Sequence, residues 1–325
     1  MIRWGILSTG TIAVKFANTL NQMKNEASLT AVASRSPEKA QEFAVTYGIP
    51  KAFGSYEAML CDPEVDAVYI ATPNNLHYEN IRDCILHHKH VLCEKPMTTD
   101  VKQAEDLFAL AEKEGVFLME GMWISHLPLL KKLKELLHSG LIGEVKHLRA
   151  DYGFVAKGAR RTRKFESSLG GGALLDVGVY NLAFARMVLG DPTGFQSKVT
   201  FSEFGTDDFS TMLLEYPNGK TAAITTAIGI AMPTEGVIYG EKGKIYFPNY
   251  QQAQTLTVEL YGETPYTIDM PFEFTGFEYQ IREAVRCIEA GLLISPFQTA
   301  EDTLAVLRTM DAIRESWGMK FIFEK

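Results

Sequence analysis

The sequence predicts a mixed α/β protein in which a doubly wound parallel sheet precedes an α+β domain with a mostly antiparallel sheet. Up to residue 121, short apolar runs alternate with stretches of helical periodicity, which is the pattern of β-α-β units. Beyond residue 121, strand-like runs follow one another with turn residues between them, which indicates antiparallel pairing. Because the chain has 325 residues, we expect two domains, at residues 1–121 and 122–325.

In the first part, each predicted strand leads into a predicted helix. The strands are expected at residues 4–7, 29–33, 67–71, 90–93 and 116–119, and the helices at 12–23, 37–47, 55–60, 76–87 and 101–114. Pro37 suits a first helical position. Either Thr99 or Asp100 is expected to cap the helix that ends before Gly115. This alternation implies a parallel sheet with helices on both faces.

The second part begins with an amphipathic helix and continues with hairpins. The helix is expected at residues 127–137. The hairpins are expected at 211–216 with 221–228 and at 236–239 with 244–247, and a further strand at 255–261. A last helix is expected to start at Thr299, where Asp302 stands in the capping-box position.

Composition narrows the class of protein. The 32 basic and 40 acidic residues give a net charge of −8, which argues against a general binder of nucleic acid or of anionic membranes. The four cysteines are scattered without a C-x-x-C pair, which fits reduced thiols in the cytoplasm. The first strand starts at Ile2, and no apolar run approaches about 18 residues, so we expect no signal peptide or membrane span. The spacing of His87, His88, His90 and Cys93 matches no common metal motif, so we expect no metal site.

The turn after the first strand is that of a dinucleotide-binding domain. Such turns carry G-x-G-x-x-G/A, and this chain has Ser8, Gly10 and Ala13 at the three positions. No acidic residue occurs before Glu26, so nothing nearby in sequence repels a phosphate at the helix N-terminus. The residues expected to contact the pyrophosphate are Ser8, Thr9, Gly10, Thr11 and Ile12.

The ends of the later strands should border the same crevice. Arg35, between Ser34 and Ser36, ends the second strand where NAD-selective domains carry an acidic residue, and its guanidinium group suits a 2′-phosphate. We therefore expect NADP, with NAD possible. The loop with Thr72, Pro73, Asn74 and His77, and the stretch Glu94, Lys95 and Pro96, complete the predicted cofactor site. A helix cap explains Asn74 equally well.

Two segments carry groups for proton transfer. Lys95 follows an apolar strand and precedes Pro96, while residues 170–180 open a helix in which Asp176 and Tyr180 are four residues apart. Residues with that spacing lie on one helix face, so Asp176 and Tyr180 point to one place where Lys95 could meet them. The basic run of Arg160, Arg161, Arg163 and Lys164 is usually a solvated face, but its position leaves open a role in holding substrate or cofactor.

Together these residues resemble the Gfo/Idh/MocA oxidoreductase family over nearly the whole chain. Within that family the chain is most similar to the branch of dimeric dihydrodiol dehydrogenases, which also oxidises D-xylose. The features shared with that branch are residues 3–6, Ser8 in place of Gly, residues 117–120 followed by Trp123, and residues 174–180. Many family members have His where this chain has Tyr180, and the Tyr form also occurs in glucose–fructose oxidoreductase.

The resemblance implies a Rossmann domain that binds NADP or NAD and a second domain that binds substrate. It also implies that the second domain has an open-faced sheet used to form dimers or tetramers. The reaction it implies is hydride transfer between the nicotinamide and a secondary alcohol or carbonyl of a sugar, polyol or cyclic vicinal diol, with Lys95, Asp176 and Tyr180 as the catalytic residues.

Several alternatives stay open. Sequence does not decide whether Lys95 or Tyr180 takes the proton; we favour Tyr180 as acid/base, with Lys95 polarising the substrate oxygen. Asp176 is expected either to orient Lys95 or to hold a substrate hydroxyl. The chain could also keep its cofactor bound and use redox transiently in another reaction, such as glycoside cleavage, or act as a non-catalytic dinucleotide sensor. The presence of both Lys95 and Tyr180 disfavours the sensor.

Overall fold

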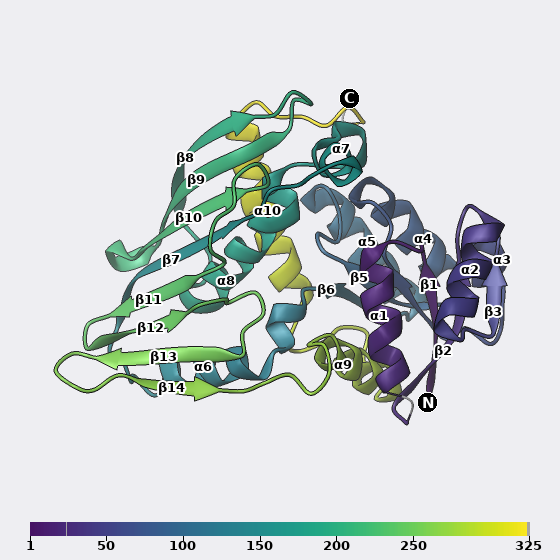
Figure 1. Ribbon diagram of the computed structural model, residues 1–325, viewed down its shortest axis with the longest axis horizontal. Coiled ribbons are helices and arrows are strands. Elements are labelled where there is room, and N and C mark those ends of the chain that lie inside the picture. Colours follow the sequence, from purple (N-terminus) through teal and green to yellow (C-terminus); the bar gives the residue numbers. More distant parts are fainter. Residues whose placement is uncertain (24, 324–325) are drawn as a thin grey trace. The chain divides into compact units, whose positions relative to one another are not determined.

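The computed structural model describes residues 1–23 and 25–323, without the side chains of residues 159 and 160 (Figure 1). Contacts between residues divide the chain into two compact units. Unit 1 comprises Met1–Trp123 and Glu273–Leu304, and unit 2 comprises Ile124–Phe272 and the chain from Ala305 onward. In the predicted division at residue 121 the chain passes once from the first domain to the second. In the structure it also returns to unit 1 near its end, at Glu273–Leu304.

Unit 1 is built on six parallel strands in the order β3-β2-β1-β4-β5-β6. Their bounds are Ile2–Leu7 (β1), Ala27–Ala33 (β2), Lys51–Phe53 (β3), Ala67–Ile70 (β4), His90–Glu94 (β5) and Leu118–Gly121 (β6). The strand order reverses between β1 and β4, and ligands of such sheets bind beyond the carboxyl ends of the strands at this point. The predicted Rossmann-type sheet is confirmed.

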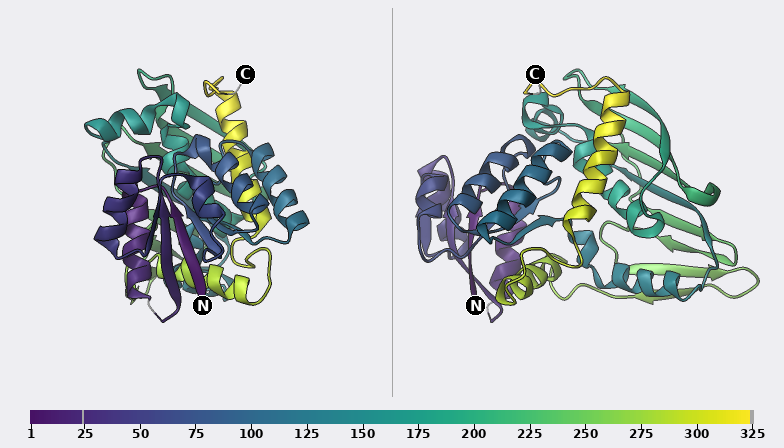
Figure 2. Two further views of the ribbon diagram at one scale, coloured as in Figure 1. Left: turned by 90° about the vertical axis from the view of Figure 1, so that its right-hand side faces the viewer. Right: turned by 180° about the vertical axis from the view of Figure 1, so that it is seen from behind.

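Helices cover both faces of this sheet. They are α1 (Thr11–Gln22), α2 (Pro37–Tyr47), α3 (Tyr56–Leu60), α4 (His77–Leu86), α5 (Val101–Glu114) and α9 (Glu278–Glu289), with short 3₁₀ turns η1 (Asn74–Leu76) and η2 (Trp123–His126). The left view of Figure 2 shows α1 and α2, in purple, on one face and α4 and α5, in blue, on the other. Asp100 caps α5 by accepting the backbone N–H of Gln103 at 3.0 Å, and Gly115 ends that helix at φ 67°.

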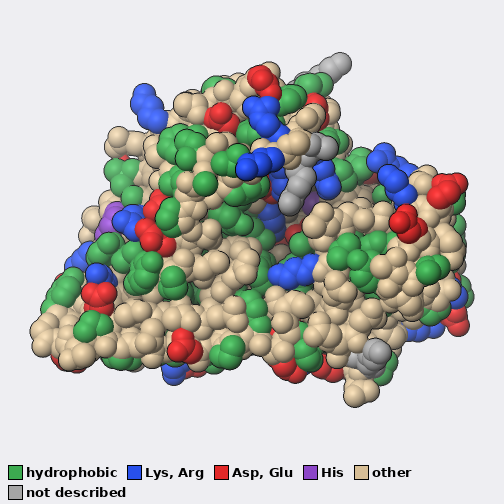
Figure 3. Space-filling view, in the orientation of Figure 1, with side chains coloured by type: hydrophobic (Ala, Val, Ile, Leu, Met, Phe, Trp, Pro, Cys, Tyr) green, Lys and Arg blue, Asp and Glu red, His purple; other side chains and the backbone are tan. Residues whose placement is uncertain are grey.

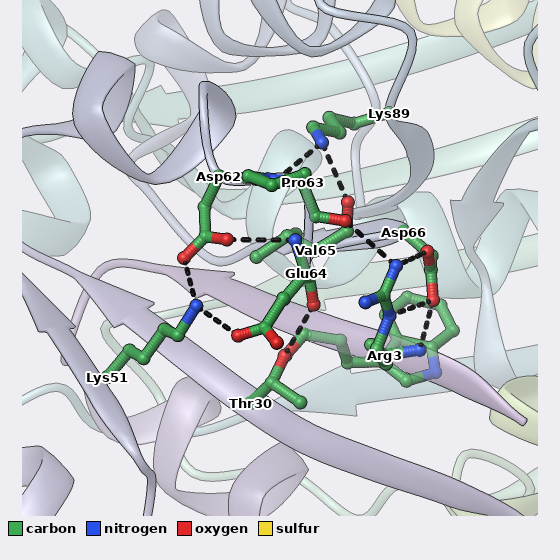
Figure 4. A network of polar contacts seen from close by, with 10 residues as sticks. Arg3, Thr30, Lys51, Asp62, Pro63, Glu64, Val65, Asp66 and Lys89 are labelled. Atoms are coloured by element: carbon green, nitrogen blue, oxygen red, sulfur yellow. Dashed lines mark hydrogen bonds and ion pairs between the residues drawn. The ribbon is translucent and has the colours of Figure 1, made fainter.

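The amino-terminal edge of the sheet is joined by charged groups (Figure 4). Arg3, at the start of β1, donates to both carboxylate oxygens of Asp66, at 2.6 and 2.9 Å. The Lys89 ammonium group, 9% exposed, donates to the carbonyl oxygens of Asp62 and Val65, each at 2.8 Å. Because ligands of parallel sheets bind at the opposite edge, we interpret this network as structural.

Unit 2 contains eight strands in the order β14-β13-β12-β11-β7-β10-β9-β8. Their bounds are Val145–Gly153 (β7), Gly194–Phe201 (β8), Asp207–Glu215 (β9), Thr221–Ala227 (β10), Gly236–Gly240 (β11), Gly243–Phe247 (β12), Thr255–Leu260 (β13) and Tyr266–Asp269 (β14). The pair β7 and β10 is parallel and the other pairs are antiparallel. The mostly antiparallel sheet and both predicted hairpins are confirmed.

The helical segments of unit 2 include one with an unusual start. They are α6 (Pro128–His138), α7 (Ala159–Phe165), η3 (Ser167–Leu169), the π-helical turn η4 (Leu174–Gly178), α8 (Val179–Leu189) and the 3₁₀ turn η5 (Pro217–Gly219). The last helix, α10 (Ala300–Ser316), passes from unit 1 to unit 2 after Leu304. The predicted capping box of α10 is confirmed, since Thr299 and Asp302 exchange side-chain to backbone hydrogen bonds of 2.9 and 3.1 Å.

One face of the unit 2 sheet is buried. In β9, Met212 and Leu214 are buried while Leu213 between them is 39% exposed. Asn181 of α8 donates its side-chain amide to the carbonyl oxygens of Ala150 and Thr225, at 3.2 and 2.9 Å, and so fixes the helix on β7 and β10.

Among the described residues, one helical stretch, Ser167–Leu189, is long and apolar enough to cross a membrane, and 67% of its most apolar window is buried in the protein. We expected no stretch of this kind. Its apolar character is that of a helix packed in the core of unit 2.

Candidate active site

The turn between β1 and α1 has the backbone of a phosphate-binding turn. Ser8 adopts φ 92°, which favours glycine, and its hydroxyl oxygen accepts the backbone N–H of Gly10 at 3.3 Å. Gly10 precedes α1 without a side-chain cap, and the first turn of α1 contains no acidic residue. Ala13 is completely buried, so the helix packs closely on the sheet. The first backbone N–H groups of α1 therefore suit an anion.

The end of β2 carries an exposed arginine followed by a helix cap. Arg35 is exposed, and Ser34 is buried beneath it, where its hydroxyl oxygen accepts the backbone N–H of Ser36 at 3.2 Å. Ser36 caps α2 by accepting the backbone N–H of Lys39 at 3.3 Å and donates to the carboxylate of Glu38 at 2.6 Å. The hydroxyl of Ser36 thus has structural partners, and the role of Arg35 toward a 2′-phosphate stays a prediction.

His77 joins the loops that follow β4 and β5. Its two ring nitrogens lie 2.8 and 2.9 Å from the carbonyl oxygens of Pro96 and Thr72. A doubly protonated ring satisfies both oxygens, but complete burial lowers the pKa of His77 and favours the neutral ring. Since this ring is inaccessible, His77 positions the two loops rather than offering a surface to a cofactor.

A buried carboxyl group ends β5. Glu94 is 7% exposed and accepts a hydrogen bond from the hydroxyl of Tyr69 on β4 and another from the backbone N–H of Lys95. Burial raises the pKa of Glu94, and the hydrogen bond from Tyr69 opposes that effect. The ring of Tyr69 stacks on Phe16 of α1 with the centroids 3.8 Å apart. One chain of contacts therefore connects α1 with the strand end that carries Lys95.

Glu120, on β6, is a second buried carboxyl group near Lys95, and sequence analysis gave it no role. It is 2% exposed and accepts hydrogen bonds from the backbone N–H of Met97 and the hydroxyl of Thr303, each at 2.9 Å. Burial raises the pKa of Glu120, whereas the charge of Lys95 lowers it. Glu94 and Glu120 are thus two buried acids, and the charge of Lys95 lowers the pKa of each against the effect of burial.

Lys15 is held between two aromatic rings of unit 1. Its ammonium nitrogen lies 4.0 Å from the ring centroid of Trp123 and 4.2 Å from that of Phe277. Burial lowers the pKa of Lys15 to about 8, although the charges of Glu94 and Glu278 oppose the shift. Nothing in the sequence pattern marked this residue, because the two rings are distant from it along the chain.

In unit 2, the π-helical turn η4 carries Asp176, and Tyr180 follows in the first turn of α8. Such turns are rare and occur mostly at functional sites. Asp176 forms an ion pair of 2.5 Å with Lys164 of α7. The basic run that we considered a solvated face thus contributes Lys164 to the site, while Arg160 lies outside the described side chains.

Tyr152 and Phe154 add an aromatic wall that sequence analysis missed. The ring of Tyr152 lies 6.1 Å from that of Tyr180, between centroids. Burial and the charge of Asp176 raise the pKa of Tyr152 to about 12, so it is a neutral phenol at physiological pH. Lys164 lies 6.0 Å from the ring centroid of Phe154. Because β7 was not predicted, no pattern indicated these residues.

The structure thus groups the predicted residues into two sets. The cofactor set lies at the carboxyl ends of β1, β2, β4 and β5 in unit 1 and includes Lys95. Asp176 and Tyr180 lie together in unit 2. Among the described residues, no group of three His, Cys, Asp or Glu side chains is arranged to hold a metal ion.

Two family models match consecutive parts of the chain. Residues 2–122 match the model described as "Oxidoreductase family, NAD-binding Rossmann fold", and residues 130–246 match the GFO/IDH/MocA C-terminal domain. A trans-1,2-dihydrobenzene-1,2-diol dehydrogenase from Xenopus laevis is 34% identical over 98% of this chain and 99% of its own length. The chain belongs to the Gfo/Idh/MocA oxidoreductase family.

Solved structures of other oxidoreductases share the whole fold. A 3-ketoreductase from Actinomadura kijaniata, in complex with NADP and TDP-benzene, has a TM-score of 0.88, 29% identity and coverage of 97% of both chains. An aldose–aldose oxidoreductase from Caulobacter crescentus, complexed with glycerol, has a TM-score of 0.87, 27% identity and the same coverage. The expected Gfo/Idh/MocA family is therefore confirmed along the full chain.

The depressed pKa of Lys15 gives a stability test. Lysine ordinarily titrates near pH 10.5, so between pH 8 and 10.5 the unfolded chain binds more protons at this position than the folded one. The free energy of unfolding should therefore rise with pH in this range, relative to a Lys15→Met variant that lacks the titration. Chemical denaturation between pH 7.5 and 10 measures the difference, with Lys102→Met, at an exposed lysine of α5, as the control. Parallel pH dependence of wild type and Lys15→Met would contradict the assignment.

Proposed function

We propose that this member of the family is an NADP-dependent oxidoreductase. It moves a hydride between the nicotinamide and a secondary alcohol or carbonyl of a sugar, polyol or cyclic vicinal diol. The observation that carries the proposal is the similarity over the full length to a diol dehydrogenase, together with the presence of Lys95, Asp176 and Tyr180. The NADP-bound 3-ketoreductase supports the choice of cofactor.

The described residues fit a dinucleotide. The uncapped start of α1 and the turn at Ser8 and Gly10 suit the pyrophosphate, and the exposed Arg35 suits a 2′-phosphate. When bound, NADP supplies the hydride acceptor or donor, and the protein supplies position and a proton path. In this proposal Glu94, Lys95 and Pro96 border the nicotinamide.

The proton path is assigned to Tyr180 and Lys95. A phenol ordinarily has a pKa near 10, and an ammonium group beside it favours the phenolate. We propose that Lys95 polarises the substrate oxygen and that the Tyr180 hydroxyl exchanges the proton with it. We propose that Asp176, which forms an ion pair with Lys164, holds a substrate hydroxyl. The neutral phenol of Tyr152 is a hydrogen-bond donor for a neighbouring substrate hydroxyl.

Assembly and location are also proposals. We propose a cytoplasmic dimer or tetramer that forms through the exposed face of the unit 2 sheet. Strands 211–216 and 221–228 are rich in apolar residues, but Met212, Leu214 and Ile224 turn to the core. The exposed face keeps Leu213 among threonines and charged groups. On the side drawn in Figure 3, hydrophobic side chains are likewise scattered among charged ones.

Tyr180→Phe should lower kcat by about 10²–10⁴-fold, because a positioned acid/base contributes that much. Since the ring is retained, NADP binding measured by fluorescence titration should be unchanged. The assay follows the reduced nicotinamide band with trans-1,2-dihydrobenzene-1,2-diol, D-xylose and other aldoses as substrates. Lys95→Met should be non-additive with Tyr180→Phe, since both act in one proton transfer.

The competing explanation is that Tyr180 is a core tyrosine. In that case Tyr180→Phe would lower the free energy of unfolding by about 1 kcal/mol and leave kcat within a few-fold. A near-normal kcat with a lowered Tm would therefore show the catalytic assignment to be wrong.

Arg35→Ala should raise the KM for NADP at least about tenfold, because a charge-assisted phosphate contact is worth about 1.5–3 kcal/mol. The KM for NAD, which has no 2′-phosphate, should change little. Arg82→Ala removes another exposed arginine, from α4, and serves as the control. Equal use of NADP and NAD by the wild-type protein would contradict the role of Arg35.

Light scattering at micromolar concentration should give the mass of a dimer or tetramer. Leu213→Glu should shift the protein toward monomer, because it places a charge in the exposed face of β9. Leu292 of unit 1 has nearly the same exposure, 40% against 39%, so Leu292→Glu is the matched control. A monomeric wild-type protein would refute self-association.

A further inference from the structure

Asp207 is a buried acid at the start of the helical segment that carries Asp176 and Tyr180. It lies at the first position of β9 and is completely buried. Its Oδ2 atom accepts the backbone N–H of Leu174 at 2.7 Å. Leu174 is the first residue of the π-helical turn η4, where backbone N–H groups have no partner within the helix. The carboxyl group therefore satisfies a donor that would otherwise be buried and unpaired.

The loop before η4 is shaped so that the carboxyl group can reach it. Gly172 adopts φ 120°, and a side chain at this position would overlap the Oδ1 atom of Asp207. The backbone N–H of Gly172 donates to the carbonyl oxygen of Lys164 at 2.9 Å. The hydroxyl of Thr206 donates to the carbonyl oxygen of Phe165 at 2.6 Å. The strand end at 206–207, the end of α7 and the start of η4 are thus tied together at one place.

The burial of Asp207 lowers the stability of the folded protein. The Oδ1 atom of Asp207 is buried and has no hydrogen-bond partner among the described residues. The pKa of Asp207 is raised to about 7, mainly by burial and also by the charge of Asp208, while the backbone N–H groups of Leu174, Asp207 and Ala173 oppose the shift. A buried acid with one unpaired oxygen destabilises a protein, and such groups are concentrated at functional sites.

We infer that Asp207 is a positioning residue that fixes the start of η4 and thereby sets where Asp176 and Tyr180 stand. Asp176 lies two residues after Leu174, and Tyr180 lies six residues after it. A shift at Leu174 is therefore passed along one rigid helical segment. Farther along it, Gly178 packs against Thr226 of β10, which leaves little room for compensation. The inference rests on the proposed function of Tyr180.

The experiment compares Asp207→Ala and Asp207→Asn with Asp208→Asn. Asp208 is the adjacent acid, and its carboxyl group accepts a hydrogen bond from Thr200, so its variant controls for the loss of one charge. Two measurements are made on folded protein. The first is steady-state kinetics, which gives kcat and KM for NADP with the faster of trans-1,2-dihydrobenzene-1,2-diol and D-xylose as substrate. The second is amide hydrogen exchange across residues 173–180.

Asp207→Ala should lower kcat at least about tenfold, since small displacements of reacting groups are that costly, and leave KM for NADP within about twofold. Exchange across residues 173–180 should become faster. Asn equals Asp as an acceptor at helix starts, so Asp207→Asn should restore kcat to within about threefold of wild type. Asp208→Asn should match wild type in both measurements.

Unchanged exchange across 173–180, or a kcat within about twofold of wild type, in folded Asp207→Ala would overturn the inference. If that variant does not fold, Asp207→Asn decides, because a kcat loss above about tenfold with unchanged exchange would show a role other than positioning. A normal kcat in Tyr180→Phe would refute the proposed function but not the positioning role of Asp207. The exchange measurement tests that role independently of catalysis.

Discussion

The hydrogen bond that Tyr69 donates to the buried carboxyl group of Glu94 holds together the edge of unit 1 on which cofactor binding depends. Through the stacking of Tyr69 on Phe16, this bond connects α1 with the ends of β4 and β5. The turn at Ser8 and Gly10, which we propose binds the pyrophosphate, and Lys95 therefore keep a fixed relation. Burial makes the carboxyl group costly, and the hydrogen bonds that it accepts are what allow it to remain there.

Much of the fold could be predicted because local signals and tertiary structure agree. The apolar strands of unit 1, the turn at Gly10 and the capping box at Thr299 each express a rule that acts within a few residues. β7, β8 and β14 were missed because they mix polar and apolar residues. In β7, for example, the half-buried His147, Arg149 and Asp151 alternate with the buried Leu148 and Ala150. The return of Glu273–Leu304 to unit 1 could not be predicted, since only long-range contacts determine it.

Residues of the candidate site could be predicted where they belong to a sequence motif. They could not be predicted where only the packing of the folded chain brings them to the site. Lys95, Asp176 and Tyr180 stand in recognisable segments. Lys164, Tyr152 and Glu120 come from elements whose neighbourhood exists only in the folded chain. The π-helical turn at Leu174 was likewise predicted as an ordinary helix, because the difference is a matter of hydrogen-bond register rather than of residue type.

The most direct test of hydride transfer is the fate of a deuterium label. The protein would be incubated with NADP and a diol or aldose that carries deuterium on the carbon to be oxidised, and the reduced cofactor would be examined by mass spectrometry. Hydride transfer predicts that the label is found on the nicotinamide ring and that turnover slows with the labelled substrate when chemistry limits the rate. The proposed reaction would be contradicted if the label appeared only in water, or if none of the diols and aldoses tested gave reduced NADP.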